Sequence, residues 1–242
     1  MLSSDRLAKF TASTIHNLFV GGKGATKDSY IMDKAIEAVK GYAKSFSSKH
    51  TEHGNINELE ALESFIEVTG MNAVYTDSQY YPINDNCGST PDAVILDFDN
   101  VISATVDLKC PTEKFFEQKM MMINDSKPEF QNVPKAYFYQ AQMQMMSLTK
   151  HNESIGYPAV TNHYLVRYLT STNYDFDGNK IEIDLPLNVR IFYKIVKADL
   201  EVQAKILQEV AQASEQRDAL IQILKQPIIW ILWLTEPLEV EL

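Results

Sequence analysis

Hydrophobic residues recur every three or four positions along much of the chain, which is the period of an amphipathic α-helix. In residues 11–19 the apolar face consists of Ile15, Leu18 and Phe19, after a threonine suited to capping the helix. The segments that we expect to be helical are 11–19, 30–46, 58–68, 113–123 and 135–149, followed by a long amphipathic region over 187–224. The stripe of that last region is Ile195, Leu200, Ile206, Leu207 and Val210.

Shorter runs of β-branched and aromatic residues, bounded by turn residues, predict strands. Two such runs lie within residues 88–111 and are joined by the polar turn 97–100. The other predicted strands are 73–81, 163–169 and 180–185, and the predicted loops are 21–29, 47–57 and 124–133. Strands interleaved with helices indicate an α/β fold, with a mixed central β-sheet flanked by helices. The methionines at 143, 145 and 146 fit the core of this fold better than a cofactor site.

Composition is that of a globular domain, with 45% hydrophobic and 22% charged residues in 242. The net charge of −10 argues against a broadly basic nucleic-acid-binding surface. Residues 1–50, however, contain eight Lys/Arg and four Asp/Glu, so this segment carries +4 and the remainder −14. Charge alone therefore leaves the partner undecided.

The two cysteines, Cys87 and Cys110, are too few for a disulfide framework or for a four-cysteine zinc or iron–sulfur site. A reducing compartment is therefore expected. The first residues lack a signal-peptide pattern, and no apolar run approaches the roughly 20 residues that span a bilayer. We expect a soluble cytoplasmic protein without a membrane partner.

Charged side chains gather at the second strand predicted within 88–111. Asp107 and Lys109 are two residues apart, so on a strand they share one face while Leu108 points away. Asp92 follows Pro91 at the start of the neighbouring strand and can face the same point. Two carboxylates and an ammonium group at one point suit a divalent cation and an activated water.

The Asp-x-Lys spacing alone is weak evidence, because Glu117-x-Lys119 and Asp125-x-Lys127 have the same spacing. These two triplets fall in a predicted helix and a predicted loop, where side chains at i and i+2 do not share a face. A surface ion pair on an edge strand remains the alternative for Asp107 and Lys109 at this point.

A second group of residues suits a phosphate. Arg6 and Ser13 flank the start of the helix predicted at 11–19. Free N–H groups at a helix start, hydroxyl groups and an arginine together suit phosphate binding. An ordinary capped surface helix is the other interpretation of these residues. Four glutamates decorate the helix predicted at 58–68, and spacing does not single out one of them.

Pro91-Asp92 followed by Asp107-x-Lys109 resembles the active-site signature of the PD-(D/E)xK nuclease superfamily. Further blocks over roughly residues 5–170 resemble the lambda-exonuclease-like, or YqaJ-type viral recombinase, family. These blocks are Arg6-Leu7, Thr11-Ala12-Ser13 with Ile15-His16-Asn17, Gly54-x-x-x-Glu58-x-x-Ala61, Lys109-Cys110-Pro111 and Pro134-x-x-Tyr137-x-x-Gln140-x-Gln142-x-Gln144. Two departures are Thr90, where the family commonly has serine, and Asp107, where many members have glutamate.

The resemblance implies a restriction-endonuclease-like core and a role for each matched residue. Asp92, Asp107, the Leu108 carbonyl and Glu58 would hold Mg²⁺, or Mn²⁺ in its place. Lys109 would orient the attacking water or stabilise charge on the phosphate, with Gln140 and Gln142 positioning water or DNA. Helix residues bonded to neighbouring backbone are the alternative for the two glutamines. Arg6 and Ser13 would bind the DNA 5′-phosphate.

The resemblance further implies one nuclease domain over 1–242, with a basic helical segment at 1–50, a catalytic core at 54–170 and a helical region at 187–242. Its activity would be digestion of linear double-stranded DNA, 5′ to 3′, leaving 3′ single strands for phage-type recombination in the host cytoplasm. A single-strand annealing recombinase would be a partner, and the chain would form a ring-shaped trimer. The alternatives are another PD-(D/E)xK nuclease, endonucleolytic or single-strand-specific, and a non-catalytic DNA-binding module.

Overall fold

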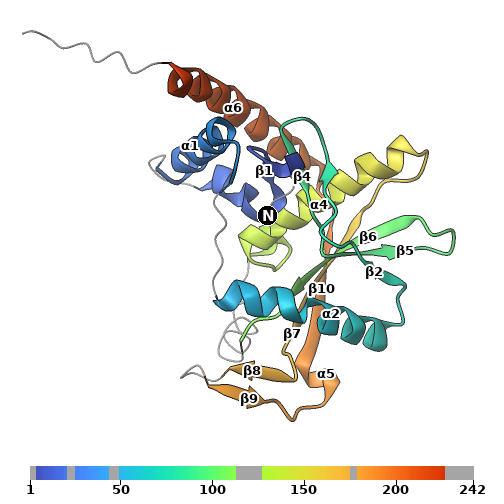
Figure 1. Cartoon of the computed structure of the whole chain (residues 1–242). Helices are drawn as coiled ribbons and strands as arrows, with labels where there is room; N and C mark the ends of the chain where they lie inside the picture. Colours follow the sequence, from blue (N-terminus) through green and yellow to red (C-terminus); the bar gives the residue numbers. More distant parts are fainter. Residues whose placement is uncertain (1–3, 21–24, 44–48, 113–126, 175–178, 227–242) are drawn as a thin grey trace, which may run out of the picture.

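A mixed five-stranded sheet forms the centre of the molecule (Figure 1). The computed structural model describes residues 4–20, 25–43, 49–112, 127–174 and 179–226. The strands run in the order β10 (Ile191–Lys197), β7 (Asn162–Tyr168), β6 (Ile102–Lys109), β5 (Ala93–Leu96) and β2 (Ala73–Tyr75). Only the β6–β7 pair among them is parallel. The predicted mixed sheet flanked by helices is confirmed.

The predicted pair of strands within 88–111 is the antiparallel hairpin of β5 and β6. Its turn is built by Asp97, whose carboxylate accepts hydrogen bonds from the N–H groups of Asp99 and Val101, each at 2.9 Å. Asn100 completes the turn with φ +61°, a left-handed conformation that asparagine tolerates. The hairpin pairs Ala93 with Val106, so Asp92 and Asp107, the residues that follow this pair outward, lie side by side at the end opposite the turn.

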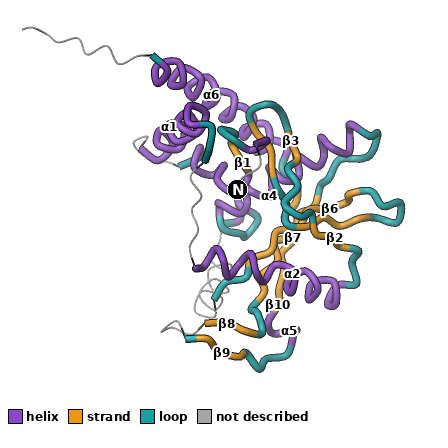
Figure 2. The backbone as a smooth tube through the Cα atoms, in the orientation of Figure 1, coloured by secondary structure: helices purple, strands orange, loops and turns teal. Residues whose placement is uncertain are grey.

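Two helices cover opposite faces of the sheet, α2 (Lys49–Thr69) and α4 (Lys135–Ser154) (Figure 2). Phe65 of α2 belongs to one buried cluster with Leu108 and Val166. Phe138 of α4 belongs to another with Leu165. Since successive strand residues point to opposite faces, Asp107 and Lys109 face α4.

A second helical layer packs at one end of α4, where α1 (Ala25–Lys40) and α6 (Leu200–Lys225) lie together in Figure 1. Lys27 of α1 pairs with Glu209 of α6 at 2.7 Å. A small sheet of β1 (Phe10–Thr11), β4 (Cys87–Ser89) and β3 (Tyr81–Pro82) and the helix η2 (Ala12–Phe19) complete this layer. The remaining elements are η1 (Ser4–Arg6), η3 (Pro128–Phe130), the β8 (Thr172–Tyr174)–β9 (Lys180–Glu182) pair and α5 (Leu187–Arg190).

The helical region predicted over 187–224, for which a break was the alternative, is broken by a strand, so the prediction is wrong in its first part. The chain makes one helical turn, α5, then the strand β10, and only then α6. Residues 191–196 are almost all β-branched or aromatic, and pairing with β7 over seven residues outweighs the helical spacing. Of the predicted stripe, Ile206 and Val210 are buried, whereas Leu200 is 76% exposed; Ile195 and Leu207 are also exposed.

Other boundaries differ from the predictions. The loop predicted at 47–57 is wrong from Lys49 onward, because α2 already begins there. Helix α1 begins at Ala25, inside the predicted loop 21–29, and ends at Lys40. The strand predicted at 73–81 is two strands, β2 and β3, in different sheets. The helix at 11–19 is a 3₁₀-helix. Residues 113–123, predicted as a helix, lie outside the described residues.

The structure bears on the two cysteines and on the possibility of a membrane-spanning helix. Cys87 and Cys110 are both buried and free, so the chain contains no disulfide. Within the described ranges, no helix combines the length and the apolar character that crossing a bilayer requires.

Candidate active site

The side chain of Asp107 lies at the centre of a buried polar cluster between β6 and α4. It is 1% exposed, and its Oδ1 accepts a hydrogen bond from Gln140 Nε2 at 2.7 Å and a longer one from Gln144 Nε2 at 3.4 Å. The ammonium group of Lys109 lies 2.7 Å from Oδ2. Apart from that ion pair, Oδ2 has no hydrogen-bond donor among the described residues. Asp107 is therefore held in place by the two amides at Oδ1, while its other oxygen already faces a cation, the ammonium group of Lys109.

Asp92 reaches the same cluster from the residue before β5. Its Oδ2 accepts a hydrogen bond of 2.7 Å from the backbone N–H of Leu108, which ties the hairpin's two strands together at this point. Burial raises the pKa of Asp92 well above its usual range, and the charge of Asp107 raises it further, while Lys109 opposes the shift. The two carboxylates therefore repel each other in a buried setting, which a cation would relieve.

Glu58 comes from α2, on the other face of the sheet, and accepts a 3.0 Å hydrogen bond from the hydroxyl of Tyr75. Burial raises the pKa of Glu58, the Tyr75 hydrogen bond and Lys109 lower it, and Asp107 raises it. The charges of Glu58 and Asp107 therefore interact. Of the four glutamates on this helix segment, Glu58 is the one that the structure brings to the cluster.

Lys109 stays charged in this setting. Burial alone would lower the pKa of Lys109, but Asp107 and Asp92 together raise it above the ordinary lysine value. Its Nζ also lies 5.4 Å from the ring centre of Tyr137, in cation–π range. A lysine held as an ammonium group suits an orienting and charge-stabilising role better than that of a general base.

Gln142 is not brought to the cluster. Its Nε2 donates to the carbonyl of Lys197 at 2.8 Å, and its Oε1 accepts from the N–H of Asp199 at 2.8 Å. Residues i and i+2 lie on different sides of a helix, whereas Gln140 and Gln144 are i and i+4 and share a face. The helical period, applied to the predicted helix, would have selected Gln144 in place of Gln142.

Two buried residues of β7 that sequence reasoning missed lie on the same face of the sheet. His163 Nδ1 and Thr105 Oγ1 are 2.7 Å apart, and burial lowers the pKa of His163 to about 4, so the ring is neutral at neutral pH. Arg167 is opposite Lys109 in the parallel β6–β7 register. No sequence signal places them there, because the parallel pairing of β6 and β7 joins strands more than fifty residues apart.

Arg6 and Ser13 lie in the N-terminal layer. Ser13 is exposed in the first turn of η2, and the Thr11 side chain makes no capping hydrogen bond there. The Nε of Arg6, the hydroxyls of Tyr80 and Thr90 and Nδ1 of His16 are buried and have no hydrogen-bond partner among the described residues. Burial lowers the pKa of Arg6, and Tyr80 opposes the shift. The unsatisfied donors of Arg6 and Tyr80, whose charges interact, suit an anionic ligand.

Residues 3–152 match the YqaJ-like viral recombinase domain family, which is more than half of the chain. The chain belongs to this family. No curated protein matches the chain.

Solved structures show the same fold in exonucleases. LHK-Exo in complex with dAMP has a TM-score of 0.65 at 23% identity, over 92% of this chain and 94% of that chain. The alkaline exonuclease LHK-Exo from Laribacter hongkongensis gives 0.65 at 22%, over 91% and 93%. A phage-related exonuclease from Haemophilus somnus 129PT gives 0.65 at 18%, over 89% and 96%.

The lambda-exonuclease-like, YqaJ-type family implies a divalent metal, and the donor set of the cluster fits one. Asp92, Asp107 and Glu58 offer the hard oxygen ligands that Mg²⁺ prefers. One Asp107 oxygen lacks a hydrogen-bond donor, and the carboxylates repel each other. The side chains do not stand ready as a cage, since the described residues include no group of three His, Cys, Asp or Glu placed to hold a metal. Each carboxylate instead has a contact inside the protein: Asp107 pairs with Lys109, Asp92 accepts from the Leu108 amide, and Glu58 accepts from the Tyr75 hydroxyl.

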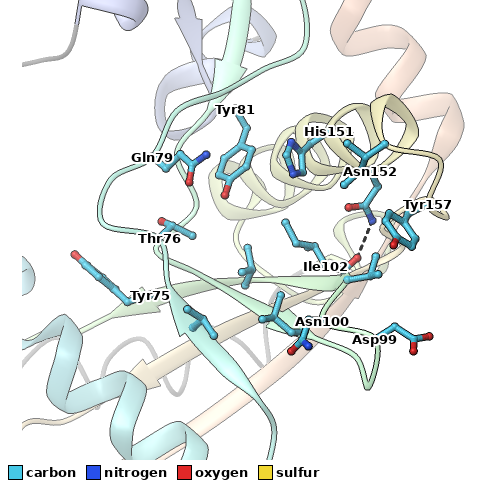
Figure 3. Close-up of a pocket in the computed structure, with 15 residues that line it drawn as sticks. Tyr75, Thr76, Gln79, Tyr81, Asp99, Asn100, Ile102, His151, Asn152 and Tyr157 are labelled. Atoms are coloured by element: carbon cyan, nitrogen blue, oxygen red, sulfur yellow. Dashed lines mark hydrogen bonds between the residues drawn. The ribbon is translucent and has the colours of Figure 1, made fainter.

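A cavity of about 350 Å³ lies elsewhere, at the far end of α4 (Figure 3). Tyr81, His151, Asn152 and Tyr157 line it, and Asn152 donates to the carbonyl of Ile102 at 2.8 Å. It contains none of the residues predicted for catalysis. Two lining residues connect it to the cluster: the hydroxyl of Tyr75 donates to Glu58, and the hydroxyl of Thr76 donates to the carbonyl of Asp92 at 3.2 Å. The polar cluster around Asp107, and not this cavity, is therefore the candidate active site of this family member.

Proposed function

We propose that the chain is a metal-dependent exonuclease that digests linear double-stranded DNA from the 5′ end, leaving a 3′ single strand. The observation that carries this proposal is the buried cluster of Asp92, Asp107 and Lys109 on one hairpin, with Gln140 holding Asp107. Family membership and the likeness to solved exonucleases support a nuclease of the lambda-exonuclease type.

Asp92 and Asp107 would hold Mg²⁺, with Mn²⁺ as the other candidate, together with the Leu108 carbonyl and Glu58. When bound, the cation supplies Lewis-acid polarisation of the phosphodiester. Gln140 and Gln144 fix the Asp107 carboxylate through Oδ1, so that Oδ2, the oxygen now paired with Lys109, keeps one direction. Lys109, an ammonium group on the rim of the cluster with 26% of its side chain exposed, would orient the scissile phosphate and stabilise the charge that develops on it.

Arg6 and Ser13 would anchor the 5′-phosphate. The unpartnered Nε of Arg6 and the hydroxyl of Tyr80 support this, because a phosphate oxygen would satisfy donors that no described residue satisfies. In the same proposal the chain assembles as a ring of three, which would let a protein of net charge −10 hold DNA through a locally basic channel. The 3′ strand would pass to a single-strand annealing recombinase.

Labelled DNA tests the polarity and the end requirement. With Mg²⁺, linear duplex carrying a 5′ label should lose the label first as mononucleotide, while covalently closed circular duplex should stay intact. Cleavage of the circle at a comparable rate would instead favour an endonuclease of the same superfamily.

The phosphate anchor has its own test. Arg6→Ala should reduce the preference for 5′-phosphorylated over 5′-hydroxyl ends by about tenfold or more, which corresponds to a charge-assisted hydrogen bond of about 1.5–3 kcal/mol. Lys40→Ala, which removes a charge at the end of α1, is the matched control and should leave that preference unchanged. An Arg6→Ala protein with the wild-type preference would reject the anchor.

A further inference from the structure

Arg167, next to the last residue of β7, carries a buried guanidinium group that has no hydrogen-bond acceptor among the described residues. The residue is 1% exposed, and its Nε, Nη1 and Nη2 are all buried with no hydrogen-bond acceptor among the described residues. A buried charge without hydrogen bonds costs several kcal/mol, so a fold retains one only when something offsets that cost. A cation–π contact with Tyr137, at 5.5 Å from its ring centre, offsets only about 1–2 kcal/mol.

Two other arginines of the fold, Arg190 and Arg217, have hydrogen-bond acceptors. Arg190 donates to the carbonyls of Leu185 and Leu169 and to the hydroxyl of Tyr168, at 2.7–3.1 Å. Arg217 donates through Nε, Nη1 and Nη2 to Asp218, the carbonyl of Ala8 and Asn86. Arg6 lacks an acceptor at Nε, whereas Arg167 lacks one at all three guanidinium nitrogens among the described residues.

The position of Arg167 indicates which acceptor it lacks. It is paired in register with Lys109 across the parallel β6–β7 ladder, so both side chains point to the α4 face. Both cations contact the ring of Tyr137, Lys109 at 5.4 Å and Arg167 at 5.5 Å. The charges of Arg167 and Asp107 also interact. The unsatisfied guanidinium group of Arg167 therefore belongs to the candidate active site, on β7, the strand next to the one that carries Lys109.

The carboxylates of the site do not satisfy Arg167. Oδ1 of Asp107 takes the two glutamine amides and Oδ2 pairs with Lys109, while Asp92 accepts the Leu108 N–H. In the proposed reaction the remaining anion is the phosphate backbone of DNA. A guanidinium offers a planar pair of N–H donors that matches two phosphate oxygens, which a lysine cannot reproduce.

We propose that Arg167 binds a phosphate of the DNA strand held in the active site, donating to its non-bridging oxygens beside Lys109. This role rests on the proposed function. It adds to that function a second cation, from a different strand, that recognises the substrate phosphate. Because the donors have no acceptor among the described residues before DNA binds, the phosphate would displace none of those residues from a hydrogen bond.

Three variants of the full chain test the role: Arg167→Met, Arg167→Lys, and Arg190→Met as the matched control on the opposite face of the sheet. Binding of 5′-phosphorylated duplex DNA is measured by fluorescence anisotropy in Ca²⁺ over a range of salt concentrations. Arg167→Met should bind about tenfold or more weakly, and its log–log salt slope should fall by about one phosphate contact, near 0.9. Arg167→Lys should restore the slope but only part of the affinity, and Arg190→Met should match the wild type.

Thermal unfolding without DNA separates this role from an internal ion pair. Removing an unpaired buried charge should leave the Tm of Arg167→Met equal to or above that of the wild type, whereas Arg190→Met, which loses three hydrogen bonds, should melt lower. A carboxylate from residues 113–126, outside the described part of the chain, would give the reverse: Arg167→Met would lose stability and keep the wild-type affinity and salt slope.

The outcomes distinguish the two proposals. If the wild type binds and cleaves DNA while Arg167→Met keeps the affinity and salt slope of Arg190→Met, the role of Arg167 is overturned and the nuclease proposal stands. If the wild type neither binds nor cleaves duplex DNA, the proposed function is overturned, and the role of Arg167 with it.

Discussion

Replacing Lys109 with methionine should expose how strongly the active-site carboxylates depend on its charge. Methionine keeps much of the length of the side chain and removes only the ammonium group that lies 2.7 Å from Asp107. Asp107 would remain 1% exposed with amide donors on one oxygen and no cation on the other. In a solution without divalent metal, only the two amides and the charge of Arg167 would then offset its charge.

Removing one partner of a buried ion pair costs about 3–5 kcal/mol. The lower end applies, because Gln140 and Gln144 still donate to Asp107 and about a quarter of the Lys109 side chain reaches solvent. A loss of about 3 kcal/mol in a chain of 242 residues lowers the Tm by about 6–12 °C. Neutralising Asp107 as well should remove most of this cost, so the double variant Asp107→Asn/Lys109→Met should be more stable than Lys109→Met alone.

The pH dependence has a defined sign. The pKa of Asp92 is already raised by burial and by Asp107, and Lys109 opposes that shift, so its loss raises the pKa further. A carboxyl group with a raised folded-state pKa takes up protons more readily in the folded state, which gains stability as pH falls below that pKa. The deficit of Lys109→Met should therefore be largest near pH 8 and shrink towards pH 4.

Urea denaturation in EDTA at pH 8, 6 and 4 gives the free energy of unfolding of the wild type, Lys109→Met, Asp107→Asn and the double variant. These values measure the cost of losing Lys109, the coupling between the two substitutions and the pH dependence of that cost. Addition of Mg²⁺ should then stabilise Lys109→Met more than the wild type, since the cation replaces the missing charge. Purely additive effects of the two substitutions, or a Lys109→Met protein as stable as the wild type at pH 8, would refute the idea that a buried carboxylate depends on Lys109.

Three further predictions follow from single contacts. Gln140→Leu should lower the free energy of unfolding by about 1–3 kcal/mol and also lower the Mg²⁺ affinity measured by calorimetry, because Asp107 loses its shorter hydrogen bond. Gln142→Leu should also lower the stability but leave the Mg²⁺ affinity unchanged. Glu58→Gln should weaken Mg²⁺ binding without destabilising the metal-free protein at pH 8, since the substitution removes a carboxylate whose pKa burial raises; a large loss of stability in urea would contradict this. The pKa of His163 is lowered to about 4, so the folded state should lose up to about 3 kcal/mol as pH falls from about 6.5 to 4, and His163→Gln should lack that loss in urea titrations.

The sequence predicted best those elements whose own periodicity decides their structure. The β5–β6 hairpin and α4 were predicted because turn residues and an unbroken helical pattern mark them, and the structure confirms both. Strand β10 was missed because its partner, β7, supplies the pairing that overrides the helical spacing. In the same way α2 begins at Lys49, before any apolar stripe is apparent in the sequence.

The candidate site shows the same division. Local strand alternation, which short-range geometry fixes, predicted that Asp107 and Lys109 share a face, and the position of Asp92 at the start of the neighbouring strand predicted that it lies near them. Glu58 was assigned to the site through the family resemblance, because the spacing of the four glutamates on that helix does not distinguish one from another. Arg167 could not be placed without knowing that β6 and β7 are parallel neighbours, a contact between distant parts of the chain. Ring assembly, DNA polarity and metal identity remain predictions.

The central claim, that the cluster around Asp107 hydrolyses DNA with a divalent metal, is tested most directly by nucleotide release from linear duplex DNA. Wild-type protein and Asp107→Asn, both shown to be folded by circular dichroism, are compared with Mg²⁺ and with EDTA. The wild type should release nucleotides only with Mg²⁺, and Asp107→Asn should release at least a thousandfold less, as expected on loss of about 4 kcal/mol of transition-state stabilisation. Equal release by Asp107→Asn, or undiminished release by the wild type in EDTA, would contradict the account.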